Sequence, residues 1–331
     1  MKKYKVAILG LGAIFDRHIS AIIGNQGHFE LIGVYDIKSD LTQSKSQELQ
    51  VKAYLTEQEV YLDNEVNCVV ILTPSNLHYS QALTAIKNHK HVIIEKPATF
   101  LSSELDHLVQ IAKENNVEAY AILQVRLNQS VEIAKLAIQH GLLGKIRNIS
   151  LIQNWQRPQE YFSGWRGAMV TSGGILREFA IHYLDILQYL VGKPNVKSAI
   201  FFNTKFKNTD VDDSIYALFD YNDFGGMMQV SIAAEPKNIE CGLNINGENG
   251  VIKLGGKSLD EIIQADFLND DITQKFMQIK NKIMDKNIML AVLTYDMSNP
   301  VFSEKRCDLL KYVPNKYSTD WVDKFVHNIT P

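Results

Sequence analysis

Apolar residues in the first third of the chain fall in short unbroken runs, separated by longer stretches of mixed polarity. Such runs are typical of strands that are buried on both faces, and the stretches between them have the length and pattern of helices. We expect strands at residues 5–9, 29–35, 68–72, 91–94 and 119–123, and helices at residues 13–23, 80–88 and 101–115. This alternation predicts a parallel sheet covered by helices.

From about residue 146 the pattern changes. Strand-like segments at residues 146–155, 196–202, 214–221, 226–233, 242–246 and 251–254 follow one another with mainly turns between them, apart from one helix at residues 175–190. Such a series predicts a largely antiparallel sheet. We therefore expect an α/β domain over residues 1–124 and an α+β domain over residues 125–331, with a helix near residues 320–328 that packs back on the first domain.

Composition narrows the possible partners. The 331 residues are 46% hydrophobic and 21% charged, with a net charge of -3, so no basic surplus supports binding to nucleic acid or an anionic membrane. Cys68, Cys241 and Cys307 are too far apart for a zinc motif or a disulfide framework. No apolar run approaches the length of about 18 residues that a membrane span needs. We expect a cytoplasmic protein that acts on a small molecule without a metal.

The opening run MKKYKVAILGLGAIFDRH has two interpretations. Lysines before an apolar run are typical of a secretory signal peptide, but charged residues from Asp16 onward interrupt this run without a clear cleavage site. Gly10 and Gly12 lie between a strand and a helix, which is typical of the turn that binds the diphosphate of a dinucleotide. The fingerprint has a third glycine where this chain has Phe15, but that glycine serves only the packing of helix on strand. We interpret Phe15 as a packing variant whose ring fills this space.

Asp36 ends the second strand, 24 residues after Gly12. An acid at about this distance binds the adenosine ribose hydroxyls of NAD, and its charge would repel the 2′-phosphate of NADP. We therefore expect NAD as the cofactor and consider NADP less suited.

Two further motifs follow the ends of expected strands, where open α/β sheets bind ligands. They are Thr73-Pro74-Ser75-Asn76-Leu77-His78 and Glu95-Lys96-Pro97. With the glycine turn, Asp36, residues 124–128, 144–146 and 247–250, and the Gly173-Gly174 pair that leads to His182, they make the chain resemble the Gfo/Idh/MocA family of dehydrogenases. The resemblance covers about three quarters of the chain.

This resemblance implies a Rossmann domain followed by a domain with an open-faced sheet, which assembles as a homodimer or homotetramer. It also implies a cis bond between Lys96 and Pro97. Including the glycine turn and Asp36, the candidate cofactor-binding residues are Gly10, Gly12, Ala13, Ile14, Asp36, Thr73, Pro74, His78, Glu95, Lys96 and Pro97. Thr73, Pro74 and His78 could equally form an ordinary turn before a helix, and Glu95 could simply end a strand.

The resemblance further implies that Lys96 and the helix of His182 approach the nicotinamide. Oxidation of a secondary alcohol needs a base for the hydroxyl proton and a cation near the forming alkoxide, roles that suit His182 and Lys96. Glu178 lies four residues before His182, and on one α-helix it would share the face of the histidine and orient it. The family has aspartate at this position and glycine two residues before the histidine, where this chain has Glu178 and Ala180. Asp185 either orients His182 or forms a structural salt bridge.

Aromatic and arginine residues precede the Gly173-Gly174 pair. The candidate substrate-binding residues are Arg126, Trp155, Arg157, Trp165, Arg166 and Asp185. Aromatic faces stack on sugar or base rings, and arginine binds carboxylate or phosphate in a bidentate manner. This arrangement is similar to family members that act on nucleotide sugars, including UDP-N-acetylglucosaminuronate 3-dehydrogenases, although a free sugar or polyol fits nearly as well. Each aromatic could equally pack the core, and Arg126 could equally brace the two domains.

We expect an oxidoreductase that transfers a hydride between NAD and a secondary alcohol of a sugar or nucleotide sugar. Two alternatives use the same scaffold: a non-catalytic dinucleotide-sensing regulator and an NAD-assisted glycoside hydrolase. The presence of both Lys96 and His182 favours an enzyme over the sensor. The polar segment at residues 256–286 is expected to be partly helical, and either caps the active site or joins a subunit contact.

Overall fold

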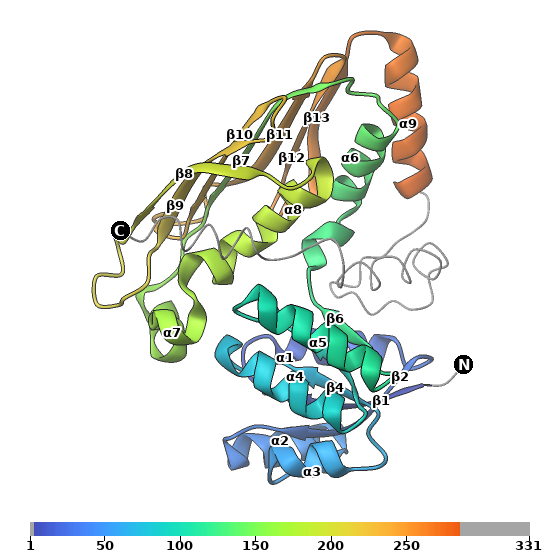
Figure 1. The fold of residues 1–331 in the computed structure, drawn as a ribbon, viewed down its shortest axis with the longest axis vertical. Helices are drawn as coiled ribbons and strands as arrows, with labels where there is room; N and C mark the ends of the chain where they lie inside the picture. The colour runs from blue at the N-terminus through green and yellow to red at the C-terminus, as the bar shows by residue number, and fades with distance from the viewer. Residues whose placement is uncertain (1–2, 285–331) are drawn as a thin grey trace. The chain divides into compact units, whose positions relative to one another are not determined.

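The computed structural model describes residues 3–284 of the chain. Within this part, residues 3–122 and residues 123–284 form two compact units, each built on one sheet (Figure 1). The helix expected near residues 320–328 lies outside the described residues. No helix within residues 3–284 has both the length and the apolar character needed to cross a membrane.

The first unit contains a six-stranded sheet in the order β3-β2-β1-β4-β5-β6, in which all neighbours are parallel. The strands are β1 (Tyr4–Leu9), β2 (Phe29–Tyr35), β3 (Lys52–Ala53), β4 (Cys68–Ile71), β5 (His91–Ile94) and β6 (Ala119–Ala121). The order reverses between β1 and β4, and this is the point in a doubly wound sheet where nucleotides bind. The expected parallel sheet is confirmed.

Helices cover both faces of this sheet. Val6 and Ile8 of β1 pack with residues of α1 (Phe15–Gly24), while Ala7 and Leu9 pack with residues of α4 (His78–Lys87) on the other face. The remaining helices are α2 (Ser39–Leu49), α3 (Glu57–Leu62), α5 (Ser102–Glu114) and the 3-10 turn η1 (Ser75–Leu77). Because both faces are buried, the strands read as unbroken apolar runs.

Phe15 is 2% exposed and packs in the same cluster as Val6 and Ile8. Its ring therefore fills the space between helix and sheet, which confirms the interpretation of this residue as a packing variant. The helix begins at Phe15 rather than at residue 13, so that Ala13 and Ile14 belong to the turn before it.

The second unit contains a seven-stranded sheet in the order β13-β12-β11-β7-β10-β9-β8. Its strands are β7 (Ile146–Asn154), β8 (Asn195–Phe202), β9 (Ser214–Asp220), β10 (Gly225–Ser231), β11 (Glu240–Gly247), β12 (Gly250–Gly255) and β13 (Glu261–Phe267). β7 and β10 are parallel and the other neighbours are antiparallel, so the expectation of a largely antiparallel sheet is confirmed.

Helices α6 (Gln129–Gln139), α8 (Ile181–Val191) and α9 (Asp270–Met284) contribute to one apolar core with the inner face of this sheet (Figure 1). The outer face exposes large apolar side chains, including Ile200, Tyr216 and Leu218. The shorter helical elements of the unit are η2 (Gln124–Leu127), η3 (Gln159–Phe162), η4 (Gly164–Gly167), α7 (Met169–Ser172) and η5 (Leu176–Ala180).

The helix expected at residues 175–190 is not uniform. Leu176–Ala180 (η5) is a π-helix, and α8 begins only at Ile181. A π-helix has bonds from residue i to i+5 and therefore a wider turn than an α-helix, and such turns are frequent at functional sites. The i, i+4 spacing of Glu178 and His182 thus does not by itself place both on one face.

Candidate active site

The glycine turn (residues 10–14) connects β1 to α1. Gly10 has a φ of +92°, and a Cβ atom there would lie 2.8 Å from the backbone carbon of Leu72. Gly12 is different, since a Cβ atom there would meet no atom of the described chain within 4 Å. Gly10 is therefore required by the fold itself, whereas the open space beside Gly12 suits the close approach of a ligand.

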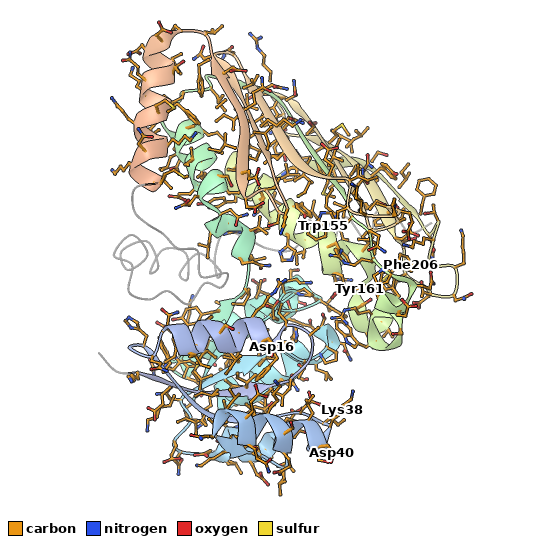
Figure 2. All side chains as sticks on the ribbon, turned by 180° about the vertical axis from the view of Figure 1, so that it is seen from behind. Asp16, Lys38, Asp40, Trp155, Tyr161 and Phe206 are labelled. Carbon is orange, nitrogen blue, oxygen red and sulfur yellow. The ribbon has the colours of Figure 1, made fainter. Side chains whose placement is uncertain are left out.

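Asp36 ties the end of β2 to this turn. Its Oδ2 accepts a hydrogen bond from the backbone N–H of Leu11 at 2.9 Å, and its Oδ1 accepts one from the backbone N–H of Lys38 at 2.9 Å. Lys38 is exposed just before α2 (Figure 2). A carboxylate has about four lone-pair sites, so Asp36 keeps acceptor capacity for two ribose hydroxyls.

These features test whether the first unit suits a dinucleotide. The open position at Gly12, the N-terminus of α1 and the half-buried carboxylate of Asp36 all lie at the reversal of strand order. A helix N-terminus favours phosphate, and an acid at the end of β2 favours ribose hydroxyls. The residues present therefore fit NAD. Among the residues that the structure describes, no group of three His, Cys, Asp or Glu side chains could hold a metal ion.

Thr73 and Pro74 follow β4 and are half-buried, as groove-lining residues would be. His78 is 1% exposed, in contrast to the expectation that it lines the cofactor groove. Its Nδ1 lies 2.7 Å from the carbonyl oxygen of Pro97, and its Nε2 lies 2.8 Å from that of Thr73. The imidazole is buried because its two ring nitrogens contact backbone carbonyls in the loops after β4 and β5.

The Lys96 loop (residues 95–97) follows β5, and its Lys96–Pro97 peptide bond is cis, as expected. The carboxylate of Glu95 faces Nε2 of His18 at 2.8 Å through Oε1 and accepts the backbone N–H of Lys96 at 2.9 Å through Oε2. Burial alone would raise the pKa of Glu95, but the contact with His18 and the charge of Lys96 outweigh it and lower the pKa. Glu95 is thus an anion held inside the unit.

Four aromatic rings and two arginines form a cluster in the second unit, which we call the aromatic–arginine cluster (Trp155, Arg157, Tyr161, Trp165, Arg166 and Phe179). The guanidinium of Arg157 lies 4.9 Å from the ring centre of Trp155 and 5.2 Å from that of Phe179. Arg166 lies 4.6 Å from the ring of Trp165 and 5.1 Å from that of Tyr161. Figure 2 labels Trp155 and Tyr161, which both contact Phe179.

The charges of this cluster are only partly compensated. Arg166 Nε lies 3.9 Å from the buried carboxylate of Glu178, which is longer than a hydrogen bond. Arg157 donates to the carbonyl oxygen of Gln156 and has no ion pair with any residue within 3–284. Burial lowers the pKa of Arg157, although a guanidinium stays charged at neutral pH. The cluster therefore has the composition of a receptor for an anionic or ring-shaped group.

Arg126 and Asp185 bind each other. Arg126 Nε donates to Asp185 Oδ2 at 2.6 Å and its Nη2 contacts Asp185 Oδ1, so the pair is bidentate. Both side chains are nearly buried, at 9% and 12% exposure. Burial raises the pKa of Asp185 and the charge of Arg126 opposes it, with a net increase. Of the alternatives left open by the sequence, the structure contains the salt bridge, formed within the second unit between η2 and α8.

His182 is half-buried in the first turn of α8, and Glu178 is buried in η5. The most important residue that sequence reasoning missed is His18, whose side chain is fully buried against Glu95. Its position on the first turn of the helix after the glycine turn, facing the sheet, was the available signal.

With the geometry established, comparison with known proteins decides the family. Residues 4–122 match the oxidoreductase family with an NAD-binding Rossmann fold, and residues 131–253 match the GFO/IDH/MocA C-terminal domain. The chain belongs to the Gfo/Idh/MocA oxidoreductase family. The matched Rossmann family is NAD-binding, in agreement with the prediction of NAD as the cofactor.

Three relatives illustrate the similarity. An uncharacterized oxidoreductase of Schizosaccharomyces pombe is 26% identical over 74% of this chain and 67% of its own length. The scyllo-inositol 2-dehydrogenase (NADP(+)) of Bacillus subtilis is 27% identical over 66% of this chain and 60% of its own length. The WlbA dehydrogenase of Bordetella pertussis, solved with NADH and UDP-GlcNAcA, is 25% identical with a TM-score of 0.77, and the match covers 86% of this chain and 89% of that chain.

Among the first curated relatives, the match spans between 49% and 67% of the relative's own length. The sugar and nucleotide-sugar dehydrogenases among the relatives do not favour the sensor or the glycoside hydrolase.

Proposed function

We propose that this Gfo/Idh/MocA protein is an NAD-dependent dehydrogenase or reductase that acts on a secondary alcohol of a sugar or nucleotide sugar. The observation that carries the proposal is the juxtaposition, at one edge of the first sheet, of a glycine turn open at Gly12 and the anchored Lys96 loop. The first feature suits the diphosphate of NAD, and the second holds a lysine beyond the end of a buried strand.

When bound, NAD supplies the hydride acceptor. The remaining chemistry is the proton and the developing charge on the alcohol oxygen. In the proposal, His182 takes the hydroxyl proton, since an imidazole titrates near neutral pH, and Lys96 stabilises the forming alkoxide. Glu178 is proposed to support the protonated imidazole, with the longer glutamate in a π-helix where the family has aspartate. In the direction of reduction the protonated His182 returns the proton to the oxygen, while Lys96 again stabilises the charge that develops there.

The aromatic–arginine cluster supports an acidic or nucleotide-linked sugar as the substrate class. A half-buried guanidinium over Trp155 and Phe179, without a carboxylate partner in the described part of the chain, matches a substrate carboxylate or phosphate better than it matches a neutral polyol. We propose Arg157, Arg166, Trp155 and Trp165 as substrate-binding residues. The roles of Arg126 and Asp185 are proposed to be indirect, because each already binds the other.

The test begins with fluorescence titration of NADH and NADPH, followed by a screen of UDP-GlcNAcA, other nucleotide sugars, free sugars and inositols at the absorbance of reduced nicotinamide. We expect tighter binding of NADH than of NADPH and turnover on one sugar class. Lys96→Ala should bind NADH normally and lose turnover. Lys87→Ala, at an exposed position in the last turn of α4, is the matched control and should behave as the wild type. Normal turnover by Lys96→Ala would remove the lysine from the reaction.

We also propose a homodimer or homotetramer. The outer face of the second sheet supports this proposal, because it exposes Ile200, Tyr216, Leu218 and Met227 together. Large exposed apolar patches are typical of protein interfaces. Analytical ultracentrifugation of the wild type and of Leu218→Glu tests it, and we expect the wild type to have the mass of an oligomer and the variant a lower mass. A wild type with the mass of a monomer, or a variant with the oligomeric mass of the wild type, would contradict the proposal.

A cytoplasmic location remains part of the proposal. Cys68 and Cys241, the two cysteines in the described residues, are both buried free thiols, as a reducing compartment allows.

A further inference from the structure

Two buried histidines of the first unit contact the Lys96 loop on either side of the lysine. His18 lies on α1 and faces Glu95, the residue before Lys96. His78 lies at the start of α4 and faces Pro97, the residue after Lys96. Their side chains come from helices on opposite faces of the sheet, since α1 packs in one core and α4 in the other.

The contact of His18 reaches the backbone of Lys96 through one intermediary. His18 Nε2 lies 2.8 Å from Glu95 Oε1, and Glu95 Oε2 accepts the backbone N–H of Lys96 at 2.9 Å. The histidine side chain is fully buried and that of Glu95 is 12% exposed. Water therefore cannot readily replace a lost partner, and an unsatisfied buried carboxylate is strongly unfavourable. The lysine backbone is thereby connected to the helix that follows the glycine turn.

The contact of His78 is direct. Its two ring nitrogens lie 2.7 Å and 2.8 Å from the carbonyl oxygens of Pro97 and Thr73. An imidazolium donates to both, but a neutral imidazole has only one N–H. Burial lowers the pKa of His78, although both carbonyls and the charge of Glu95 oppose this. The two contacts connect the backbones of the loops that follow β4 and β5.

We propose that His18 and His78 are positioning residues that hold the Lys96 backbone from its two sides. The inference rests on the proposed function of Lys96. Neither histidine needs to touch substrate or cofactor for this role, because both are buried and act through Glu95 and Pro97. A displacement of about 1 Å at a reacting group can reduce turnover about 100-fold.

The His18 arm uses His18→Leu and the conservative His18→Gln, whose amide N–H has a reach similar to that of Nε2. We expect His18→Leu to lower kcat about 10- to 100-fold, with the Kd for NADH within about threefold of the wild type, and His18→Gln to restore most of the loss. A purely structural role would instead move kcat and Kd together with Tm. If His18→Leu does not fold, His18→Asn, whose amide is too short to reach Glu95, takes its place. A normal kcat in His18→Leu, or in His18→Asn where it replaces His18→Leu, would contradict the positioning role of His18.

Variants of His78 distinguish its contact with the carbonyl oxygen of Pro97 from its contact with that of Thr73. The amide N–H of asparagine lies near the position of Nδ1 and can still donate to Pro97, whereas that of glutamine lies near Nε2 and can donate only to Thr73. We expect His78→Asn to keep kcat within about fivefold of the wild type and His78→Gln to lose about tenfold or more. Equal losses, or the reverse order, would overturn the assignment of Pro97 as the contact that positions the lysine.

A third measurement needs no substrate. The rate of acetylation of Lys96 by N-hydroxysuccinimide acetate is followed by mass spectrometry, with the exposed Lys87 as the internal reference. We expect the ratio of the two rates to change at least about threefold in His18→Leu and His78→Gln, but not in His78→Asn. An unchanged ratio in both would overturn the inference. If the wild type turns over none of the sugars but these ratios change, the proposed function fails while the positioning role stands.

Discussion

The two units hold their candidate residues by different means. In the first unit the contacts run mainly to the backbone: Asp36 accepts the N–H of Leu11, Glu95 accepts that of Lys96, and His78 faces two carbonyls. In the second unit they run between side chains, with Arg157 on aromatic rings and Arg126 on Asp185. Contacts to the backbone are determined by where the strands end and the loops begin, whereas contacts between side chains belong to the packing that stabilises the unit.

This difference predicts different consequences of substitution. In the first unit a side chain can be changed at an open position with loss of ligand binding and little loss of stability. In the second unit the charged residues are buried or half-buried against aromatic side chains, so a substitution removes a binding group and a packing contact together.

The largest effect is expected at the Arg126–Asp185 pair. Asp185→Leu leaves a guanidinium that is only 9% exposed without its carboxylate, and breaking such a buried pair lowers the free energy of unfolding by about 3–5 kcal/mol. Urea unfolding followed by tryptophan fluorescence measures it, because Trp155 and Trp165 lie in the second unit and residues 3–122 contain no tryptophan.

The matched control for this prediction is the ion pair of Lys197 and Asp220 on the same unit. Its lysine is 63% exposed, so Lys197→Ala should change the unfolding midpoint little. The contrast between the units would be contradicted if Asp185→Leu and Lys197→Ala had the same unfolding midpoint. It would also be contradicted if Asp185→Leu reduced the free energy of NADH binding by as much as it reduced the free energy of unfolding.

The next effect is expected at the glycine turn. A valine side chain at Gly12 meets no atom of the described chain near its Cβ, but it occupies the space proposed for the diphosphate. Gly12→Val should therefore weaken NADH binding about 100-fold or more, which is about 2.7 kcal/mol, with little change in Tm. Calorimetric titration and a thermal melt of the same sample measure both.

Gly10→Ala provides the contrast within the same turn. Its φ of +92° and the backbone of Leu72 oppose any side chain, so this variant should lose stability even without ligand. Equal melting temperatures for the two glycine variants would contradict the assignment of one glycine to the fold and the other to the cofactor.

The same contrast explains how far the sequence could be interpreted. In the first unit, the unbroken apolar run of β1, the two glycines and Asp36 are local signals, and each follows from the rules of a parallel sheet. The pairing of His18 with Glu95 joins residues that are 77 positions apart, and no local pattern indicates it. In the second unit, the sequence does not indicate the π-helix at Leu176–Ala180, because one wide turn of five residues changes the hydrogen-bond register without changing the pattern of apolar residues.

The partners in the second unit were beyond sequence reasoning for a related reason. From the sequence alone, Arg126 could equally have bound substrate. Only the packing of η2 against α8 places it beside Asp185. The aromatic–arginine cluster was noticed from composition, but which guanidinium lies on which ring depends on β7 and η3 to η5 meeting in the fold. Side-chain contacts between distant segments are determined by tertiary packing, whereas backbone contacts at strand ends follow from the fold class.

A smaller effect is expected at Glu178, the position where the family has aspartate. Glu178→Asp shortens the side chain by one methylene and moves the carboxylate away from Arg166, which is already 3.9 Å away. We expect kcat to change about tenfold, with the Kd for NADH unchanged, because a displacement of this size affects a positioned group strongly. Glu178→Gln keeps the length and removes the charge. If both variants had the kcat of the wild type, Glu178 would have no part in the reaction.

The smallest effect is expected from the titration of Glu95. Its pKa in the folded chain is below the ordinary value of 4.5, so its carboxylate stabilises the fold above pH 4.5, and this contribution is lost as the pH falls through the lowered pKa. Glu95→Gln lacks that contribution, and the difference in unfolding free energy between wild type and variant should shrink as the pH is lowered from 5 towards 3. Paired urea titrations at several pH values measure the trend. A difference that grows on acidification would mean that the buried carboxylate destabilises the Lys96 loop, and the backbone anchoring of the first unit would then rest on His78 alone.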